Sequence, residues 1–237
     1  MLCTGKSQRG AKRRDMIRHG RDVTTVAGGL YDPQSERTSH AHMGWDKAGA
    51  LKMERDGQVV ASRREWFTTA AVVTLGPDDL LLVAGPPAQR RRFLDMLISH
   101  VDTEYLQALI AYTRSLAQRN RVLAAGGDAA LLDIYDQQLV LAGGYLHTRR
   151  VDIVDFCQEW FTRDLAEISH ESEVGGMEFR PSIRSPNSGV EAWKEVFYDT
   201  LKTTRKRDVE LGYSSSGPHR DDLFISLDKR PARTFAS

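Results

Sequence analysis

The spacing of apolar residues divides the chain into two parts. Between residues 22 and about 82 the apolar runs are short and punctuated by glycine, a pattern that predicts antiparallel strands. From 89 to about 169 apolar residues recur three and four positions apart, as on the buried face of packed helices. Breaks between helices are expected at Gly126-Gly127 and Gly143-Gly144. The pattern therefore predicts an α+β protein in which a β-rich part precedes a helical part.

The remainder of the chain is predicted to return to a strand. Residues 170–190 are rich in Gly, Pro and Ser and predict a loop. An amphipathic helix is expected from Glu191 to Thr204, and Arg205-Lys206-Arg207 at its end would complement the helix dipole. Alternation from Leu223 to Leu227 predicts a strand. The expected domain organisation is 1–88, 89–206 and 207–237.

The segment PDDLLLVAGPPAQRRRFLD, residues 77–95, holds the first candidate chemistry. It predicts an apolar strand, a Gly-Pro-Pro turn and a helix that begins just after Pro87. Arg90, Arg91 and Arg92 cannot share one helix face, so some of them must face solvent, a phosphate or a carboxylate. Taken alone, such a run is more often a solvated face than a nucleic-acid contact.

A second segment, SSSGPHRDDLFISL at residues 214–227, combines a Gly-Pro turn with charged residues at the start of the predicted strand. Polar residues in this position either satisfy backbone groups and one another or form a site. The sequence leaves both alternatives open. The cluster consists of His219, Arg220, Asp221 and Asp222.

These two segments resemble RecF, a family of bacterial DNA replication and repair proteins that are ATPases of the SMC/Rad50 type. Pro86 departs from the pattern, which has a small residue there. Residues 112–120 and 135–139 resemble the helical domain of RecF, so the resemblance covers almost the whole chain. It implies a β-rich partial head of an ABC/SMC-type ATPase with an inserted helical domain. The fitting residues are Pro77, Asp78, Leu82, Val83, Gly85, Pro87, Arg90, Arg91, Phe93, Leu94 and Asp95.

The resemblance also implies a function. The intact family protein is expected to bind DNA at single-strand/double-strand junctions, to dimerise with ATP and Mg²⁺, and to act with RecO and RecR. Gap repair, fork restart and the SOS response to DNA damage are the implied processes, and the implied location is the cytoplasm, at the nucleoid. The alternative is a non-catalytic helical interaction module whose basic arm binds DNA or a protein.

Both ends of the chain resemble interior parts of that family. Thr4-Gly5-Lys6-Ser7 matches the end of a Walker A loop, but the charged residues after it do not suit a buried P-loop helix. The resemblance instead places this stretch after the Walker helix. It makes Ser237 the start of an ABC signature that contacts the nucleotide of an opposite subunit. We therefore expect an internal fragment without Walker A, Walker B or a catalytic residue, which neither hydrolyses nor tightly binds ATP.

Charge is balanced overall and unbalanced locally. The chain has 33 Lys and Arg against 32 Asp and Glu, a formal charge of +1. The first 22 residues alone hold seven Lys and Arg against two Asp, which suits contact with phosphates. A frayed basic terminus explains the same composition equally well. The expected DNA contacts are Lys6, Arg9, Lys12, Arg13, Arg14, Arg90, Arg91 and Arg92.

Other classes of site receive no support from the sequence. The two cysteines, Cys3 and Cys157, form neither a disulfide framework nor a zinc spacing. No apolar run approaches the roughly 18 residues typical of a membrane helix. His40 and His42 would share one face of a strand, but no clear further ligand accompanies them, so no metal is expected there.

Overall fold

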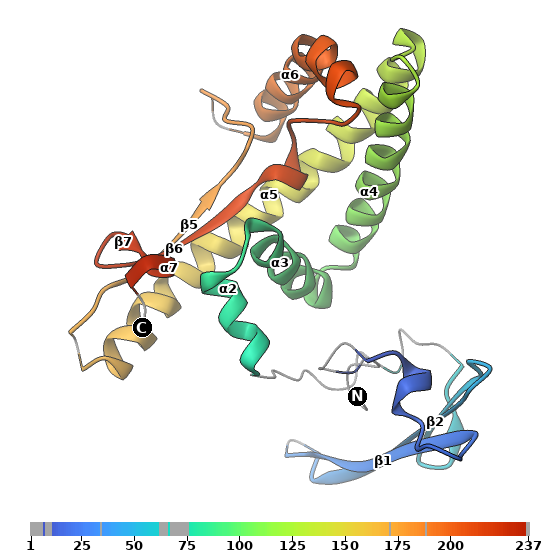
Figure 1. The fold of residues 1–237 in the computed structure, drawn as a ribbon. Helices are drawn as coiled ribbons and strands as arrows, with labels where there is room; N and C mark the ends of the chain where they lie inside the picture. Colours follow the sequence, from blue (N-terminus) through green and yellow to red (C-terminus); the bar gives the residue numbers. More distant parts are fainter. Residues whose placement is uncertain are drawn as a thin grey trace. The chain divides into compact units, whose positions relative to one another are not determined.

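Contacts between residues divide the chain into two compact units. Unit 1 is Met1–Pro77 and unit 2 is Asp78–Ser237, so the boundaries expected near 88 and 206 both fall within unit 2 (Figure 1). In the described part of the chain, no helix is long and apolar enough to cross a membrane. The computed structural model describes residues 7, 11–33, 35–61, 66, 76–170, 172–187 and 189–235.

Unit 1 is built on an antiparallel sheet of four strands in the order β1-β2-β3-β4. The predicted antiparallel strands are thus confirmed over the described residues, while the apolar run at 70–75 lies outside them. A short 3-10 helix, η1 (Arg13–Met16), precedes the sheet. The strands are β1 (Val23–Asp32), β2 (Arg37–Asp46), β3 (Leu51–Arg55) and β4 (Gln58–Val59).

One face of this sheet is covered. Ala41, Met43 and Trp45 alternate along β2 and are buried, as period-two patterning requires. Ile17, which follows η1, belongs to the same core. The indole Nε1 of Trp45 donates to the Arg13 carbonyl at 2.8 Å. The segment before β1 is therefore attached to the sheet by packing and by a hydrogen bond.

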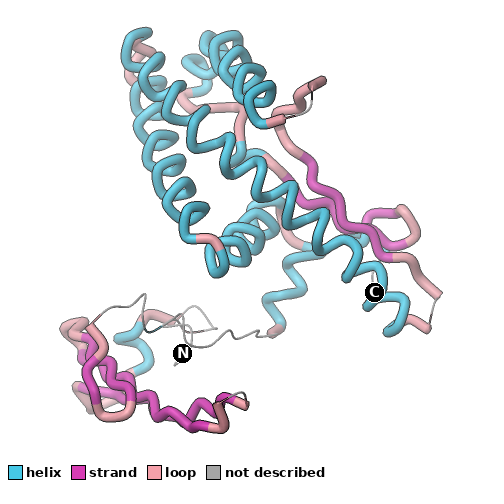
Figure 2. The backbone as a smooth tube through the Cα atoms, turned by 180° about the vertical axis from the view of Figure 1, so that it is seen from behind, coloured by secondary structure: helices cyan, strands magenta, loops and turns pink. Residues whose placement is uncertain are grey.

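Unit 2 is organised around one long helix, α5, which packs against α4, α6 and β5 (Figures 1 and 2). A three-stranded antiparallel sheet has the order β5-β6-β7. The elements are η2 (Pro77–Leu80), α2 (Leu81–Ala84), α3 (Pro87–Val101), α4 (Thr103–Ala124), α5 (Ala129–Ile168), β5 (Gly175–Arg180), α6 (Val190–Leu211), η3 (Pro218–Arg220), β6 (Asp222–Leu227), β7 (Arg230–Pro231) and α7 (Ala232–Phe235).

The predicted helices and the return strand are confirmed. Asp102 and Asp128 cap α4 and α5, each accepting a backbone N–H at 2.9 Å. Gly126 and Gly127, both with positive φ, form the predicted break between these helices. The apolar stripes of the helices meet in one core that includes Tyr105, Tyr112, Leu139, Leu146, Trp193, Phe197 and Leu201.

The apolar run before the Gly-Pro-Pro turn is not the predicted strand. It forms η2 and the short helix α2, and the N–H of Gly85 donates to the Leu81 carbonyl at 2.9 Å. Three consecutive leucines favour a helix, because leucine loses little side-chain freedom there. Leu80 is 72% exposed, so the run is not a buried strand either.

The predicted break at Gly143-Gly144 is also wrong, because α5 is continuous through both residues. A Cβ on Gly143 would lie 3.1 Å from Cε1 of Phe197, and one on Gly144 would lie 2.6 Å from Cε of Lys194. Both neighbours belong to α6. These glycines therefore allow α6 to approach α5 closely rather than ending a helix.

Two further predictions are wrong, one for the segment before α6 and one for the end of that helix. The predicted loop at 170–190 contains β5, which pairs with β6 from Gly175↔Leu227 to Arg180↔Asp222. Helix α6 continues to Leu211 and is followed by Gly212 with a φ of 74°. Arg205–Arg207 therefore lie inside the helix, and the expected complement to the helix dipole is absent from its last turn.

We expect Gly217→Ala to lower the free energy of unfolding of unit 2 by about 2–4 kcal/mol, because it combines backbone strain with crowding. Gly217 has a φ of 131°, and a Cβ there would lie 2.6 Å from the Tyr112 hydroxyl. Gly126→Ala is the matched control, because its φ is 106° but no atom lies within 4 Å. Urea unfolding measures both, and equal losses would contradict the packing argument.

Candidate nucleic-acid interface

The two segments that carry the RecF resemblance meet in space. The Arg90 guanidinium donates to both oxygens of Asp222, Nε to Oδ1 at 2.7 Å and Nη2 to Oδ2 at 3.0 Å. Its Nη1 donates to the Gly85 carbonyl at 2.8 Å. Arg91 Nη1 donates to the Asp221 carbonyl at 2.7 Å. The arginine run and the polar cluster therefore bind each other, while the third arginine, Arg92, is exposed.

Arg150 lies between these segments and is buried. Its Nη1 donates to Asp221 Oδ2 at 2.9 Å and to the Pro218 carbonyl at 2.7 Å. Its Nη2 donates to Asp95 Oδ1 at 2.8 Å, and its Nε to the Tyr105 hydroxyl at 3.0 Å. We call these five residues the Arg150 junction, and they connect α3, α4 and α5 to the segment that leads into β6.

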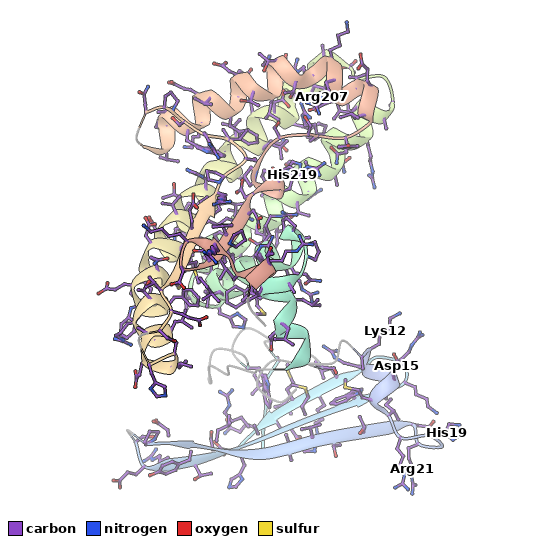
Figure 3. All side chains as sticks on the ribbon, turned by 60° about the vertical axis from the view of Figure 1, so that its left-hand side comes forward. Lys12, Asp15, His19, Arg21, Arg207 and His219 are labelled. Carbon is purple, nitrogen blue, oxygen red and sulfur yellow. The ribbon has the colours of Figure 1, made fainter. Side chains whose placement is uncertain are left out.

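His219, labelled in Figure 3, is a neutral ring held on both of its nitrogens. Its Nε2 lies 3.0 Å from the Ser214 carbonyl, which only accepts, so Nε2 carries the proton. Nδ1 then accepts from the Tyr112 hydroxyl at 2.8 Å. Burial lowers the pKa of His219 to about 4. The ring therefore connects α4 to the start of η3 and is uncharged at neutral pH.

A second buried network ties α4, α5 and α6 together. The fully buried Arg119 donates to Asp136 Oδ1 at 2.7 Å and to Asp208 Oδ2 at 2.8 Å. Arg205 of α6 also pairs with Asp136. Ser214 donates its backbone N–H to Asn120 Oδ1 at 2.8 Å. The helical segments at 112–120 and 135–139 thus form one interface, and Arg205 takes part in it.

The charges of these two networks are satisfied internally. Arg90, Arg119 and Arg150 each face carboxylates, so neither the carboxylates nor the guanidiniums stand free for acid–base chemistry. Among the described residues there is no group of three His, Cys, Asp or Glu that could hold a metal ion. The geometry of His219, Asp221 and Asp222 corresponds to the alternative in which polar residues satisfy backbone groups and one another.

An exposed basic surface occurs in unit 1. Residues 11–22 carry five basic and two acidic side chains. Lys12, Arg14, Arg18 and Arg21 are exposed, and Arg13 is half-buried. Figure 3 shows Lys12, Asp15, His19 and Arg21 at one end of the β1–β2 ribbon, with Lys12 and Arg21 projecting outward. We call residues 11–22 the basic segment.

Three of the sequence-predicted site residues cannot be placed. Lys6, Arg9 and Ser237 lie outside the described residues, as does most of the Walker-like stretch at 4–7. The structure brings Arg90 and Arg91 together with Asp221 and Asp222 in unit 2. The contact of Arg90, Arg91 and Arg92 with DNA stays a prediction.

Two central residues, Arg119 and Arg150, were missed by sequence reasoning, which assigned no chemistry to these helices. Arg150 lies four residues after Leu146 and four before Val154, both buried. Arg119 lies four residues before the buried Leu123. A charged residue on the apolar stripe of a helix is the signal that would have revealed both, because a charge there requires partners.

Comparison with known proteins gives a consistent result, although no family model matches the chain. A protein of Stenotrophomonas maltophilia named DNA replication and repair protein RecF is 31% identical over 242 residues, covering 98% of this chain and 63% of that protein. The protein of the same name from Bacillus cytotoxicus is 29% identical, and the match covers 100% of this chain and 64% of that protein. The chain thus spans slightly less than two thirds of these relatives.

Solved structures agree with the sequence comparison. A structure described as the recombination mediator protein RecF-ATP in the RecFOR pathway has a TM-score of 0.84 at 23% identity, covering 100% of this chain and 64% of that one. The chain therefore shares the mixed helix-and-sheet fold of that structure. With its relatives matched along nearly its whole length, it belongs to the RecF family, as the two segments predicted.

The ATP of that structure raises the question of whether the described residues of this chain suit a nucleotide. Asp221 and Asp222, the acidic pair of the polar cluster, already bind Arg150 and Arg90. The candidate nucleotide contact Ser237 lies outside the described residues. That this chain does not bind ATP tightly therefore stays a prediction.

We expect Arg150→Met to lower the free energy of unfolding of unit 2 by about 3–5 kcal/mol, because it leaves Asp95 and Asp221 without their counter-ion. Arg163→Met on the same helix is the control, since the Arg163 side chain is 60% exposed, pairs with its neighbour Asp164 and lies over the Trp160 ring. That change should cost about 1 kcal/mol or less. Similar losses in the two variants, measured by urea unfolding, would show that the junction contributes no more than a surface ion pair.

Stability should fall as the solution is acidified from pH 6.5 towards 4. Burial lowers the pKa of both His147 and His219 to about 4, below the ordinary value of 6.5. The unfolded chain therefore binds more protons in that window, so the stabilisation is complete above pH 6.5 and is lost as pH falls through it.

The total effect should be on the order of a few kcal/mol. Urea midpoints at a series of pH values measure it. His219→Gln should flatten the dependence, because an amide does not titrate there. An unchanged slope in that variant would contradict the assignment of His219.

Proposed function

We propose that this chain serves DNA replication and repair as part of a RecF-type protein, and that it contacts DNA phosphates through the basic segment. Membership of the RecF family supports the process, and the exposed cationic side chains of residues 11–22 support the site. Lys12, Arg14, Arg18 and Arg21 present guanidinium and ammonium groups that bind phosphates without regard to base sequence.

The attachment of the basic segment to the sheet is the observation that carries this proposal. The buried Ile17 and the hydrogen bond from Trp45 to the Arg13 carbonyl hold the segment in place. A frayed terminus would lose all of its conformational entropy when it bound DNA. This segment has already lost much of its conformational entropy in the folded protein, so its binding costs less. The attachment to the sheet therefore supports a DNA contact by residues 11–22 over the alternative of a frayed terminus.

The arginine run of unit 2 has a smaller part in this proposal. Arg90 and Arg91 bind Asp222 and the Asp221 backbone, so a phosphate would compete with these bonds. Arg92 is exposed and remains the member of the run that can reach a phosphate without breaking one of them. We assign Arg90 and Arg91 to the fold and Arg92 to an accessory contact.

The wider cycle of the family completes the proposal. Structures described as RecF with ATP in the RecFOR pathway support a role for ATP and for the RecO and RecR partners. The ATP-dependent homodimer and the location at the nucleoid rest on the sequence resemblance to RecF. ATP hydrolysis would require groups beyond those that the structure describes. The second candidate function, a non-catalytic interaction module, is favoured by the internally paired charges of unit 2. DNA binding that depends on unit 1 discriminates against it.

We expect the combined change Lys12→Ala, Arg13→Ala and Arg14→Ala to weaken binding to unrelated DNA sequences by a similar factor, at least about tenfold at low salt. The slope of log affinity against log salt should become less steep by roughly 0.9 for each lost phosphate contact on duplex DNA. Fluorescence anisotropy over a salt series measures both quantities.

A control with the same change of charge is available in unit 2. Arg121, Lys206 and Arg207 are exposed, and replacing all three with alanine should leave affinity nearly unchanged. If the control loses as much affinity as the basic-segment variant, or if the latter binds undiminished, the DNA surface lies elsewhere.

A further inference from the structure

The outer face of the unit 1 sheet has a shallow groove of about 490 Å³, on the side opposite the buried Met43 and Trp45. His40 and His42 of β2 and Glu54 of β3 line it, together with the small residues Ala27 and Gly29 of β1. The sequence placed both histidines on one face of a strand, and the proposed DNA contact through residues 11–22 does not use them.

The strand register explains why this groove exists. Gly29 lies opposite His40, and Ala27 lies opposite His42. A larger side chain in either position would cover the neighbouring ring, as cross-strand pairs normally do. With glycine and alanine there, neither position has a large side chain to cover the rings, and the Thr38 methyl group is the nearest atom to a Cβ built on Gly29.

Glu54 supplies the polar side of the groove. It lies opposite His42 in the register, and its Oε2 is 3.4 Å from His42 Nδ1. Its other oxygen contacts Lys52, which lowers the pKa of this carboxyl and keeps it ionised. An ionised carboxylate only accepts hydrogen bonds, so it selects a partner with N–H donors.

Two further groups extend the same face along the sheet. Tyr31, on the face of Ala27 and Gly29, is 64% exposed. The Lys52 side chain is 63% exposed. An aromatic ring and a cation on either side of a flat groove match a strand of bases joined by phosphates.

We propose that this groove holds an unpaired base of single-stranded DNA, with its ring against the imidazoles of His40 and His42 and its exocyclic amino group donating to Glu54. This inference rests on the proposed function and deepens it. Cytosine and adenine present such an amino group and thymine does not. Duplex DNA is excluded, because a base must leave its stack to enter a groove on a flat sheet.

A metal ion is the competing occupant of two histidines and a carboxylate. Among the described residues, no group of three His, Cys, Asp or Glu suited to a metal occurs. The open ring faces suit stacking, which a metal would not use. An unpaired base therefore accounts for more of the groove than a cation does.

The test fills the groove without touching the basic segment. Ala27→Leu places an isobutyl group beside His42, while Thr25→Leu makes a comparable change one cross-strand pair further along the same exposed face. Fluorescence anisotropy with labelled oligodeoxycytidine, oligodeoxythymidine and a duplex of the same length reads out the effect on the full 237-residue chain.

The wild-type chain should bind oligodeoxycytidine more tightly than oligodeoxythymidine. Ala27→Leu should weaken binding to oligodeoxycytidine about tenfold, the loss expected for one stacked base, and leave duplex binding unchanged. Thr25→Leu should change neither. If Ala27→Leu has no effect while the Lys12, Arg13 and Arg14 variant loses affinity, the groove proposal is wrong and the proposed function stands.

A second measurement tests the groove separately from the proposed function. If the chain bound no oligonucleotide, the proposed function would fail, and the groove would be tested with deoxycytidine monophosphate alone. Ring-proton NMR shifts of His40 and His42 that are absent in Ala27→Leu would support the groove. The absence of shifts in the wild-type chain would overturn it.

Discussion

The fold of unit 2 depends on the burial of one guanidinium. Arg150 is almost completely removed from water, and a charge in that position is tolerated only when its partners replace the lost hydration. Asp95, Asp221, Tyr105 and the Pro218 carbonyl provide them from α3, α4 and the segment before β6. Because these partners come from three different parts of the chain, the helices and the return strand must assemble together to satisfy the buried charge.

This dependence gives a physical meaning to the two segments that carry the family resemblance. Their arginines and aspartates bind one another, with Arg90 paired to Asp222 in a bidentate arrangement. A charged sequence that would suggest a nucleic-acid contact is thus largely used to join helices to a sheet. We propose that phosphates instead contact mainly the basic segment of unit 1, whose local excess of positive charge is hidden by the net charge of +1 for the whole chain.

Much of this arrangement could be predicted from sequence, and the failures have identifiable causes. Short, glycine-punctuated apolar runs predicted the antiparallel sheet of unit 1, alternation located β6, and apolar stripes predicted the helices of unit 2. Gly143 and Gly175 misled the prediction, because each makes room for a packed neighbour rather than ending an element. The partners of Arg150 could not be predicted, because they lie 45 to 71 residues away in sequence. Local pattern carries no information about pairs at that separation.

We propose that DNA binds the basic segment of unit 1, while the two motif segments of unit 2 stabilise the fold. Hydrogen–deuterium exchange of the full chain with and without DNA tests it most directly. The account predicts that DNA slows exchange at residues 11–22 and leaves residues 87–95 and 218–222 as they are in the free protein. Slower exchange at those two motif segments, with residues 11–22 unaffected, would contradict it.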